Sequence, residues 1–224
     1  IDQFATEIGG EVYIFPAEGF MGMIGLTNGL IRNNVRNYDE FPVIGTAKAD
    51  SIKTKSPSII LKGAYDKTVS EDLRFRLSAS YYANPSSPSI TLYSGDRTGS
   101  NYFGAMELAA WANGTADFTS GRFNPGYSNS INSIIINPFV KFKGLEFFGT
   151  YELASGKSVN EKPDAVDGSN RKTNQLSADL IYRFFANEQV FVGVRYNQVN
   201  SRLVGYTENV TIDRLAFAAG WFLT

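Results

Sequence analysis

Basic side chains recur at alternate positions in several stretches of the chain, a spacing that suits the binding or steering of anions. Arg74 and Arg76 are two residues apart, and so are Lys141 and Lys143. Successive side chains of a β-strand point to opposite faces, so each pair would lie on one face of its strand. Rings of Arg or Lys favour anions in a pore. The pattern therefore predicts basic pore-lining residues, for which the candidates are Lys62, Arg74, Arg76, Lys141, Arg183, Arg195 and Arg214.

Acidic side chains share the same face and support a second interpretation. They are Glu11, Asp66, Glu146, Glu152 and Asp179. Cross-strand pairs of opposite charge would stiffen the wall without contacting any solute. Arg74 and Arg76 remain the strongest candidates for solute contact, because neither has a neighbouring acid on its own strand.

The residue types exclude several kinds of catalysis. The chain contains no histidine and no cysteine, so a Ser-His-Asp triad, a catalytic thiolate and a cysteine zinc site are ruled out. Glu146 and Glu152 would share a face but lie about 20 Å apart, whereas glycosidase carboxyl groups need roughly 5–10 Å. We expect no enzyme activity, no metal site and no cofactor. The formal net charge of −1 gives no indication of nucleic-acid binding.

The charged positions alternate with a second set that carries no charge, as in Leu73, Phe75, Leu77, Ala79 and Tyr81. This alternation predicts nine strands, at roughly residues 8–15, 20–29, 57–67, 72–84, 132–143, 145–156, 174–185, 189–200 and 211–223. Strands of soluble proteins usually have about five or six residues, and a tilted strand that crosses a bilayer needs about 9–11. Two-faced strands of this length suit a wall between lipid and water. We expect an all-β fold, an antiparallel up-and-down transmembrane β-barrel, in a single domain over residues 1–224.

Two features of the uncharged face add further expectations. Tyr81, Tyr151, Tyr196 and Trp221 lie toward strand ends, where amphipathic rings are stable at the level of lipid headgroups. The general enrichment of aromatic residues in strands would also explain them. Pro138 cannot donate a ladder hydrogen bond, so we expect a local bulge there.

The expected connections alternate strictly between short and long along the chain. The long ones cover roughly residues 30–56, 85–131, 157–173 and 201–210. Short turns at one rim and long loops at the other are typical of outer-membrane barrels. A loop as long as 85–131 is unusual without a function, and we expect it to fold back into the lumen and narrow it. Its segment NYFGAMELAAWANG could instead form a short helix or an extra strand.

Three segments resemble a known family. They are YSGDRTGSNYF (93–103), TSGRFNPGYSNSINSIIINPFVKFKGLEFFGTYELASGK (119–157) and DRLAFAAGWFLT (213–224), and they resemble the porin-like outer-membrane barrels grouped with the phosphate-selective porins. The resemblance implies a barrel of about sixteen strands, often trimeric, that passes small anions. It also implies that basic residues of loops hold the anion, which makes Arg97 and Arg122 loop anion-binding candidates.

Nine strands are too few for such a barrel, and an odd number does not close a typical bacterial single-chain barrel. We therefore expect the sequence to be an incomplete part of the barrel, with strands missing at the C-terminal end and before residue 8.

These expectations converge on a porin-like channel for passive diffusion of small, mainly anionic, solutes in the outer membrane of a Gram-negative bacterium. Its expected partners are outer-membrane lipid and lipopolysaccharide, with either a homotrimer or an accessory protein, and no nucleic acid. A structural or accessory barrel with a plugged lumen that docks a partner protein is the alternative. A soluble ligand-binding β-barrel or sandwich is a third possibility, and it would bury the apolar face inside.

Overall fold

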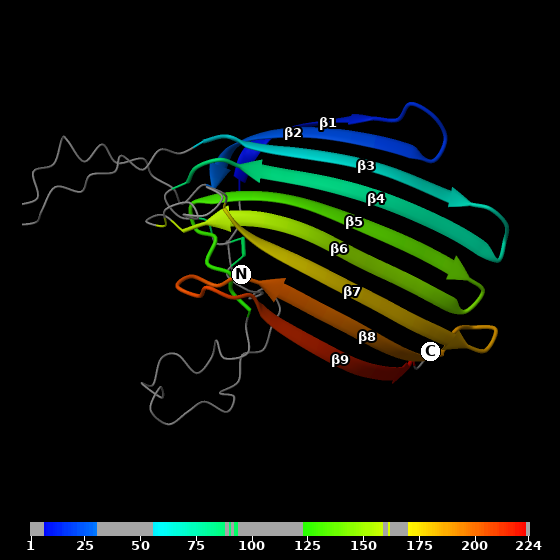
Figure 1. Ribbon diagram of the computed structural model, residues 1–224. Helices are drawn as coiled ribbons and strands as arrows, with labels where there is room; N and C mark the ends of the chain where they lie inside the picture. Colours follow the sequence, from blue (N-terminus) through cyan, green and yellow to red (C-terminus); the bar gives the residue numbers. More distant parts are fainter. Residues whose placement is uncertain are drawn as a thin grey trace, which may run out of the picture.

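A single antiparallel sheet contains every strand that the structure describes (Figure 1). The computed structural model describes residues 7–30, 56–87, 90, 92–93, 123–158, 161 and 170–222. The strands are β1 (Glu7–Ile14), β2 (Phe20–Leu30), β3 (Ser58–Thr68), β4 (Leu73–Asn84), β5 (Ser130–Phe142), β6 (Leu145–Lys157), β7 (Arg171–Phe184), β8 (Val190–Ser201) and β9 (Val210–Trp221). Each strand pairs with the next one along the chain, in the order β1 to β9. The expectation of nine up-and-down antiparallel strands is confirmed.

The strand bounds agree closely with the expected ones, and the largest shift is at β7. This strand begins at Arg171, whereas the alternation of apolar residues indicated a start near residue 174. Arg171, Lys172 and Thr173 are polar, so they carry no apolar signal, although they pair with β6. Among the described residues no helix is long and apolar enough to cross a bilayer.

The connections alternate as expected. The short ones are residues 15–19, 69–72, 143–144 and 185–189, and Figure 1 shows them together at one end of the sheet. The other connections, residues 31–57, 85–129, 158–170 and 202–209, join strands at the opposite end. We call these two ends the short-turn end and the long-loop end.

The expected bulge at Pro138 is wrong. The register of β5 with β6 runs through this position without a shift, from Ile136 opposite Tyr151 to Phe139 opposite Phe148. Gly149 explains why the proline is tolerated. A Cβ at Gly149 would lie 2.9 Å from Cγ of Pro138, so the glycine leaves room for the pyrrolidine ring.

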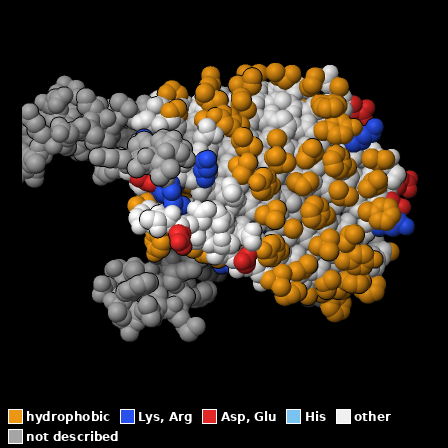
Figure 2. All heavy atoms as spheres, in the orientation of Figure 1, with side chains coloured by type: hydrophobic (Ala, Val, Ile, Leu, Met, Phe, Trp, Pro, Cys, Tyr) orange, Lys and Arg blue, Asp and Glu red, His pale blue; other side chains and the backbone are white. Residues whose placement is uncertain are grey.

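The two faces of the sheet differ in composition and in exposure. The face that Figure 2 shows is covered with hydrophobic side chains over most of the sheet, and we call it the apolar face. Its residues are strongly exposed; Leu180, for example, is 44% exposed. The opposite face, here called the polar face, is less exposed, and Ser177 in the middle of β7 is only 8% exposed. This difference indicates that the sheet curves toward its polar face, which crowds the side chains there.

A small apolar core lies on the polar face near the long-loop end. It consists of Ile90, Tyr127, Ile131 and Ala154, with Tyr82 and Tyr93 packed against it. Ile90, Tyr93 and Tyr127 come from connection 85–129, so the described parts of this connection lie against the polar face. Residues 94–122 are outside the described residues, and so is the NYFGAMELAAWANG segment.

Candidate functional site: the polar face of the sheet

The strand register places all seven basic candidates on the polar face. Lys62 lies opposite Ser80, and Arg76 lies opposite Asp66 and Phe139. The remaining five follow from the same alternation, and they are Arg74, Lys141, Arg183, Arg195 and Arg214. Arg97 and Arg122 lie outside the described residues.

Two of the basic residues form forked ion pairs with aspartates on neighbouring strands. Arg74 donates from Nε to Oδ1 of Asp66 at 2.9 Å and from its terminal nitrogen to Oδ2 at 2.7 Å. Arg195 binds both oxygens of Asp179 in the same way, and Asp179 is only 9% exposed. Forked pairs fix side-chain orientation as well as charge. These two arginines are therefore held by carboxylates of the sheet, although their side chains are 50% and 61% exposed.

Two further basic residues belong to a four-charge cluster at the short-turn end. Nζ of Lys141 lies 3.1 Å from Glu188 and 3.8 Å from Glu146. Nε of Arg183 lies 3.4 Å from Glu146 and 3.8 Å from Glu188. The two acids alternate with the two bases, so the cluster has no net charge. Glu188 comes from the turn between β7 and β8, and the alternation of the strands gave no signal for it.

The last three basic candidates have no such partner. Among the described residues, no carboxylate lies within 4.0 Å of a basic nitrogen of Lys62, Arg76 or Arg214. The guanidinium carbon of Arg76 lies 5.3 Å from the centre of the Phe139 ring, within cation–π range. Its Nε is buried and makes no hydrogen bond. Of the predicted set, these three side chains are the ones available to an anion.

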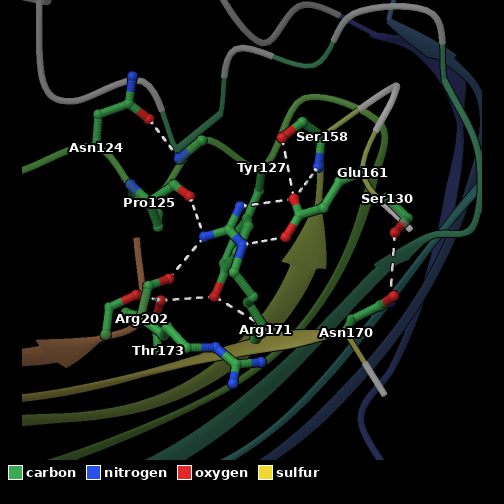
Figure 3. Close-up of polar contacts among 12 residues, drawn as sticks. Asn124, Pro125, Tyr127, Ser130, Ser158, Glu161, Asn170, Arg171, Thr173 and Arg202 are labelled. Atoms are coloured by element: carbon green, nitrogen blue, oxygen red, sulfur yellow. Dashed lines mark hydrogen bonds and ion pairs between the residues drawn. The ribbon is translucent and has the colours of Figure 1, made fainter. Parts of the chain in front are cut away.

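A buried arginine ties three long connections to the sheet at the long-loop end (Figure 3). Arg171, at the start of β7, is 5% exposed and binds both carboxylate oxygens of Glu161 in a fork. Its second terminal nitrogen donates to the carbonyl oxygens of Pro125 at 2.5 Å and Arg202 at 2.7 Å. The guanidinium also lies 5.2 Å from the ring centre of Tyr127. We call Arg171 and these four partners the rim clamp.

The acid of the rim clamp, Glu161, stays ionised. Burial by itself raises the pKa of Glu161, but the hydrogen bonds from Arg171 and Ser158 outweigh burial and leave the pKa below its ordinary value. Ser158 donates to Glu161 from its backbone nitrogen at 2.8 Å and from its hydroxyl at 3.0 Å. An ionised Glu161 is therefore held on both sides, by the sheet and by its own loop.

Two tyrosines from connection 85–129 anchor it on the polar face. Tyr127 is 2% exposed, and its hydroxyl lies 3.0 Å from the carbonyl oxygen of Arg171 and 2.7 Å from the hydroxyl of Thr173. Tyr93 donates to the carboxylate of Glu152 on β6. Burial, and for Tyr93 the charge of Glu152, raises the pKa of both phenols, so both stay neutral donors. The connection thus narrows the space over the polar face at this end.

A second polar cluster joins β1 to β4 at the same end. Glu7 accepts hydrogen bonds from Tyr82 at 2.7 Å and Ser58 at 3.1 Å, and also from Thr27. Asn84 in turn donates to Ser58 at 2.8 Å. The rim clamp and the Glu7 cluster depend on residues far apart in sequence, and neither was predicted.

The described residues offer charge and hydrogen bonding but no catalytic constellation. They contain no group of three or more acidic side chains that could hold a metal ion. Known protein families, curated proteins and solved structures were all compared with the chain, and none matches it. The polar face can bind or steer a charged solute through its unpaired bases, and its paired charges stiffen the sheet.

Proposed function

We propose that this chain forms part of the wall of an outer-membrane β-barrel channel for small, mainly anionic, solutes. The observation that carries the proposal is the inverted burial of the sheet. Leu180 on the apolar face is 44% exposed, whereas Asp179 beside it on the polar face is 9% exposed. A water-soluble sheet buries its apolar face, and an exposed apolar surface of this extent indicates contact with lipid or protein. Lipid accounts for a surface that covers nearly every strand (Figure 2).

The height and the borders of the apolar face support the proposed contact with lipid. On β7 it runs from Leu176 to Phe184, about 27 Å along the strand, or roughly 20 Å in height if the strand is tilted by about 40°. An outer-membrane barrel has an apolar band about 25 Å tall between two aromatic girdles. Tyr81 and Tyr196 border the belt toward the long-loop end, whereas Tyr151 lies inside it, one position before Leu153 on the same face. Aromatic residues border it toward the short-turn end, and they are Phe20, Tyr65, Phe142, Phe184 and Trp221.

The two edge strands suggest that the sheet is an arc of a larger barrel. Among the described strands, β1 and β9 each have a partner on one side only. β9 is 12 residues long, and its segment 215–221 carries no charge and no proline. Soluble proteins protect such edges with charge, proline or bulges. We propose that further strands pair with β1 and β9 and close a barrel of about sixteen strands, as the resemblance to the phosphate-selective porins implies.

In this barrel the polar face lines the lumen, and its cations divide into two classes. Arg74, Arg195, Lys141 and Arg183 have carboxylate partners and contribute little net charge to the lumen. Lys62, Arg76 and Arg214 have no carboxylate partner among the described residues, and Glu7, Glu11 and Glu152 on the same face have no basic partner there, so these unpaired charges balance in number. We propose that the local positive charge of the unpaired cations favours anions, as rings of Arg or Lys do in pores. The paired cations support the interpretation that charge pairs stiffen the barrel wall. The unpaired cations support the interpretation that basic side chains select anions.

Ion selectivity in planar bilayers tests the proposal. Purified protein should conduct, with chloride favoured over potassium in the reversal potential, and Arg76→Gln or Lys62→Gln should lower that preference. The matched control is the double variant Asp66→Asn/Arg74→Gln, which removes a whole ion pair and leaves the net charge of the lumen unchanged. It should keep the wild-type selectivity. An equal loss in the control and in Arg76→Gln would contradict the assignment, and no conductance from the intact protein would contradict the channel.

The packing of connection 85–129 on the polar face favours one alternative. Tyr93 and Tyr127 occupy part of the proposed lumen, so the barrel could be plugged and serve as an accessory barrel that docks a partner protein. A stoichiometric partner together with absent conductance would support this function. A homogeneous, conducting homotrimer would count against it. In either case we propose the bacterial outer membrane, with its lipid and lipopolysaccharide, as the location.

A further inference from the structure

Two lysines lie side by side on the apolar face, immediately beyond the apolar belt at the long-loop end. Lys157 ends β6 and Lys172 is the second residue of β7. Lys172 lies opposite Ser155, so Lys157 is its diagonal neighbour on the same face. Diagonal neighbours in an antiparallel pair are about 7–8 Å apart. Two flexible ammonium groups at this separation can reach one common anion.

In the part of the chain that the structure describes, no acid compensates the two charges. Among the described residues, no carboxylate lies within 4.0 Å of the ammonium of Lys157 or Lys172. Asp213, an acid on the same face, accepts hydrogen bonds from Tyr196 at 2.7 Å and Gln198 at 2.8 Å. Like charges directly opposite each other destabilise a sheet, and diagonal ammonium groups repel each other more weakly. An anion bound between the two lysines would remove that repulsion.

The surroundings of the lysines are apolar on one side and polar on the other. Toward the belt lie Leu153 and Leu176, which are 41% and 44% exposed. Asn174, opposite Leu153, is an exposed amide on the same face. Figure 2 shows basic side chains at this border, between the hydrophobic field and the long-loop end. A ligand that fits here has an anionic head and an apolar body.

We propose that Lys157 and Lys172 bind the phosphate of an anionic outer-leaflet lipid whose acyl chains lie along Leu153 and Leu176. The proposal rests on the proposed function, because it requires the apolar face to contact lipid. A solute in the lumen cannot reach this site. Arg171, between the two lysines in register, points to the polar face and belongs to the rim clamp. The lipid site and the proposed solute path therefore use opposite faces.

Binding of lipopolysaccharide with phosphorylated lipid A to the purified barrel in detergent micelles tests this site. Each basic residue at a membrane surface strengthens binding about fivefold, so Lys157→Gln/Lys172→Gln should weaken it by roughly thirtyfold. Lys157→Arg/Lys172→Arg should restore most of the affinity. Lys62→Gln is the matched control, since it removes one lysine from the polar face and should leave lipid affinity unchanged. Lipopolysaccharide with dephosphorylated lipid A should bind wild type as weakly as phosphorylated material binds the double variant.

Three results would overturn the site. They are wild-type lipid affinity in Lys157→Gln/Lys172→Gln, equal loss in Lys62→Gln, and displacement of the lipid by inorganic phosphate at equal concentration. The last result would mean that the lysines bind a free anion. Conductance of the same preparations separates this inference from the proposed function. A double variant that conducts and keeps its lipid affinity contradicts the lipid site alone, whereas a wild-type protein that never conducts contradicts the channel.

Discussion

Replacing Arg171 by alanine should release three long connections from the polar face at once. Arg171 reaches connection 85–129 through Pro125 and Tyr127, connection 158–170 through Glu161, and connection 202–209 through Arg202. No other side chain in the described part of the chain is shown to bind all three. We therefore expect these connections to open together, while the strands below them keep their pairing.

The cost follows from what the substitution leaves behind. Arg171 is 5% exposed and the Glu161 side chain is 18% exposed. Arg171→Ala therefore leaves the Glu161 carboxylate without its partner at a place that water reaches poorly. It also removes a donor from the carbonyl oxygens of Pro125 and Arg202. Breaking one side of a buried ion pair typically costs about 3–5 kcal/mol. Every 1.4 kcal/mol is a factor of about ten, so local opening should become at least about a hundredfold more frequent.

Hydrogen exchange of the folded protein measures this opening by segment. Amides in residues 123–129 and 202–209 should lose about two or more orders of magnitude of protection in Arg171→Ala, with strand amides unchanged. Lys172→Gln is the matched control, because it removes one positive charge from the adjacent, exposed position and should change stability by no more than about 0.5 kcal/mol. Arg171→Met/Glu161→Gln removes both charges and should recover part of the protection. Protection within a factor of about three of wild type in Arg171→Ala would refute the clamp.

Acidification should open the same connections in the wild-type protein. The folded pKa of Glu161 lies below the ordinary value of 4.5, so its ion pair stabilises the rim above that value. This stability is lost as the pH falls through the lower, folded pKa. Loop amides should therefore keep their protection down to about pH 4.5 and lose it at lower pH. In Glu161→Gln the protection of the same amides should not change over this range, and an identical acid response in that variant would assign the effect to another group.

Two other matched pairs test the fold. Leu180→Arg should block barrel assembly in outer-membrane-like lipid at a cost of about 2–4 kcal/mol. Ile181→Arg should assemble normally, because it would place the guanidinium opposite Glu146 on the polar face. Equal assembly of both variants would contradict lipid contact. Gly156→Ala should lower the thermal stability and expose Tyr127, because the new Cβ would lie 2.5 Å from the Tyr127 ring. Gly63→Ala has open space around its Cβ and should melt like wild type. Unchanged tyrosine fluorescence in Gly156→Ala would contradict the packing of Tyr127.

The strands and their two faces were predictable because alternation is a local property. Within each strand apolar and polar residues alternate with a period of two, and this alternation can be recognised without any distant residue. Residues 171–173 were missed at the start of β7 because polar residues at a strand end lack that signal. The strict alternation of short and long connections then indicated an up-and-down arrangement of the strands.

The partners of the charges were not predictable, because they depend on side-chain reach across strands. The register places Asp66 opposite Arg76, yet the carboxylate binds the diagonal neighbour Arg74. Arg74 was a leading candidate for solute contact only because its own strand offers no acid. Arg76, the other leading candidate, has no carboxylate within 4.0 Å among the described residues, so we propose that it keeps that role. The rim clamp and Glu188 were missed for a related reason: their geometry is set by connections whose conformation no local pattern encodes.

The register also bears on the soluble alternative. From β2 to β9 the pairing runs without a shift, and the only irregularity lies between Glu7 and Gly9 on β1. A one-residue slip would exchange the two faces of a strand, and no such slip is present on the inner strands. A soluble barrel would therefore need this same sheet to curl toward its apolar face. The exposures indicate the opposite curvature, since Ser177 and Asp179 are buried while Leu176 and Leu180 are exposed. The exposed apolar surface therefore supports the proposal that lipid covers this face.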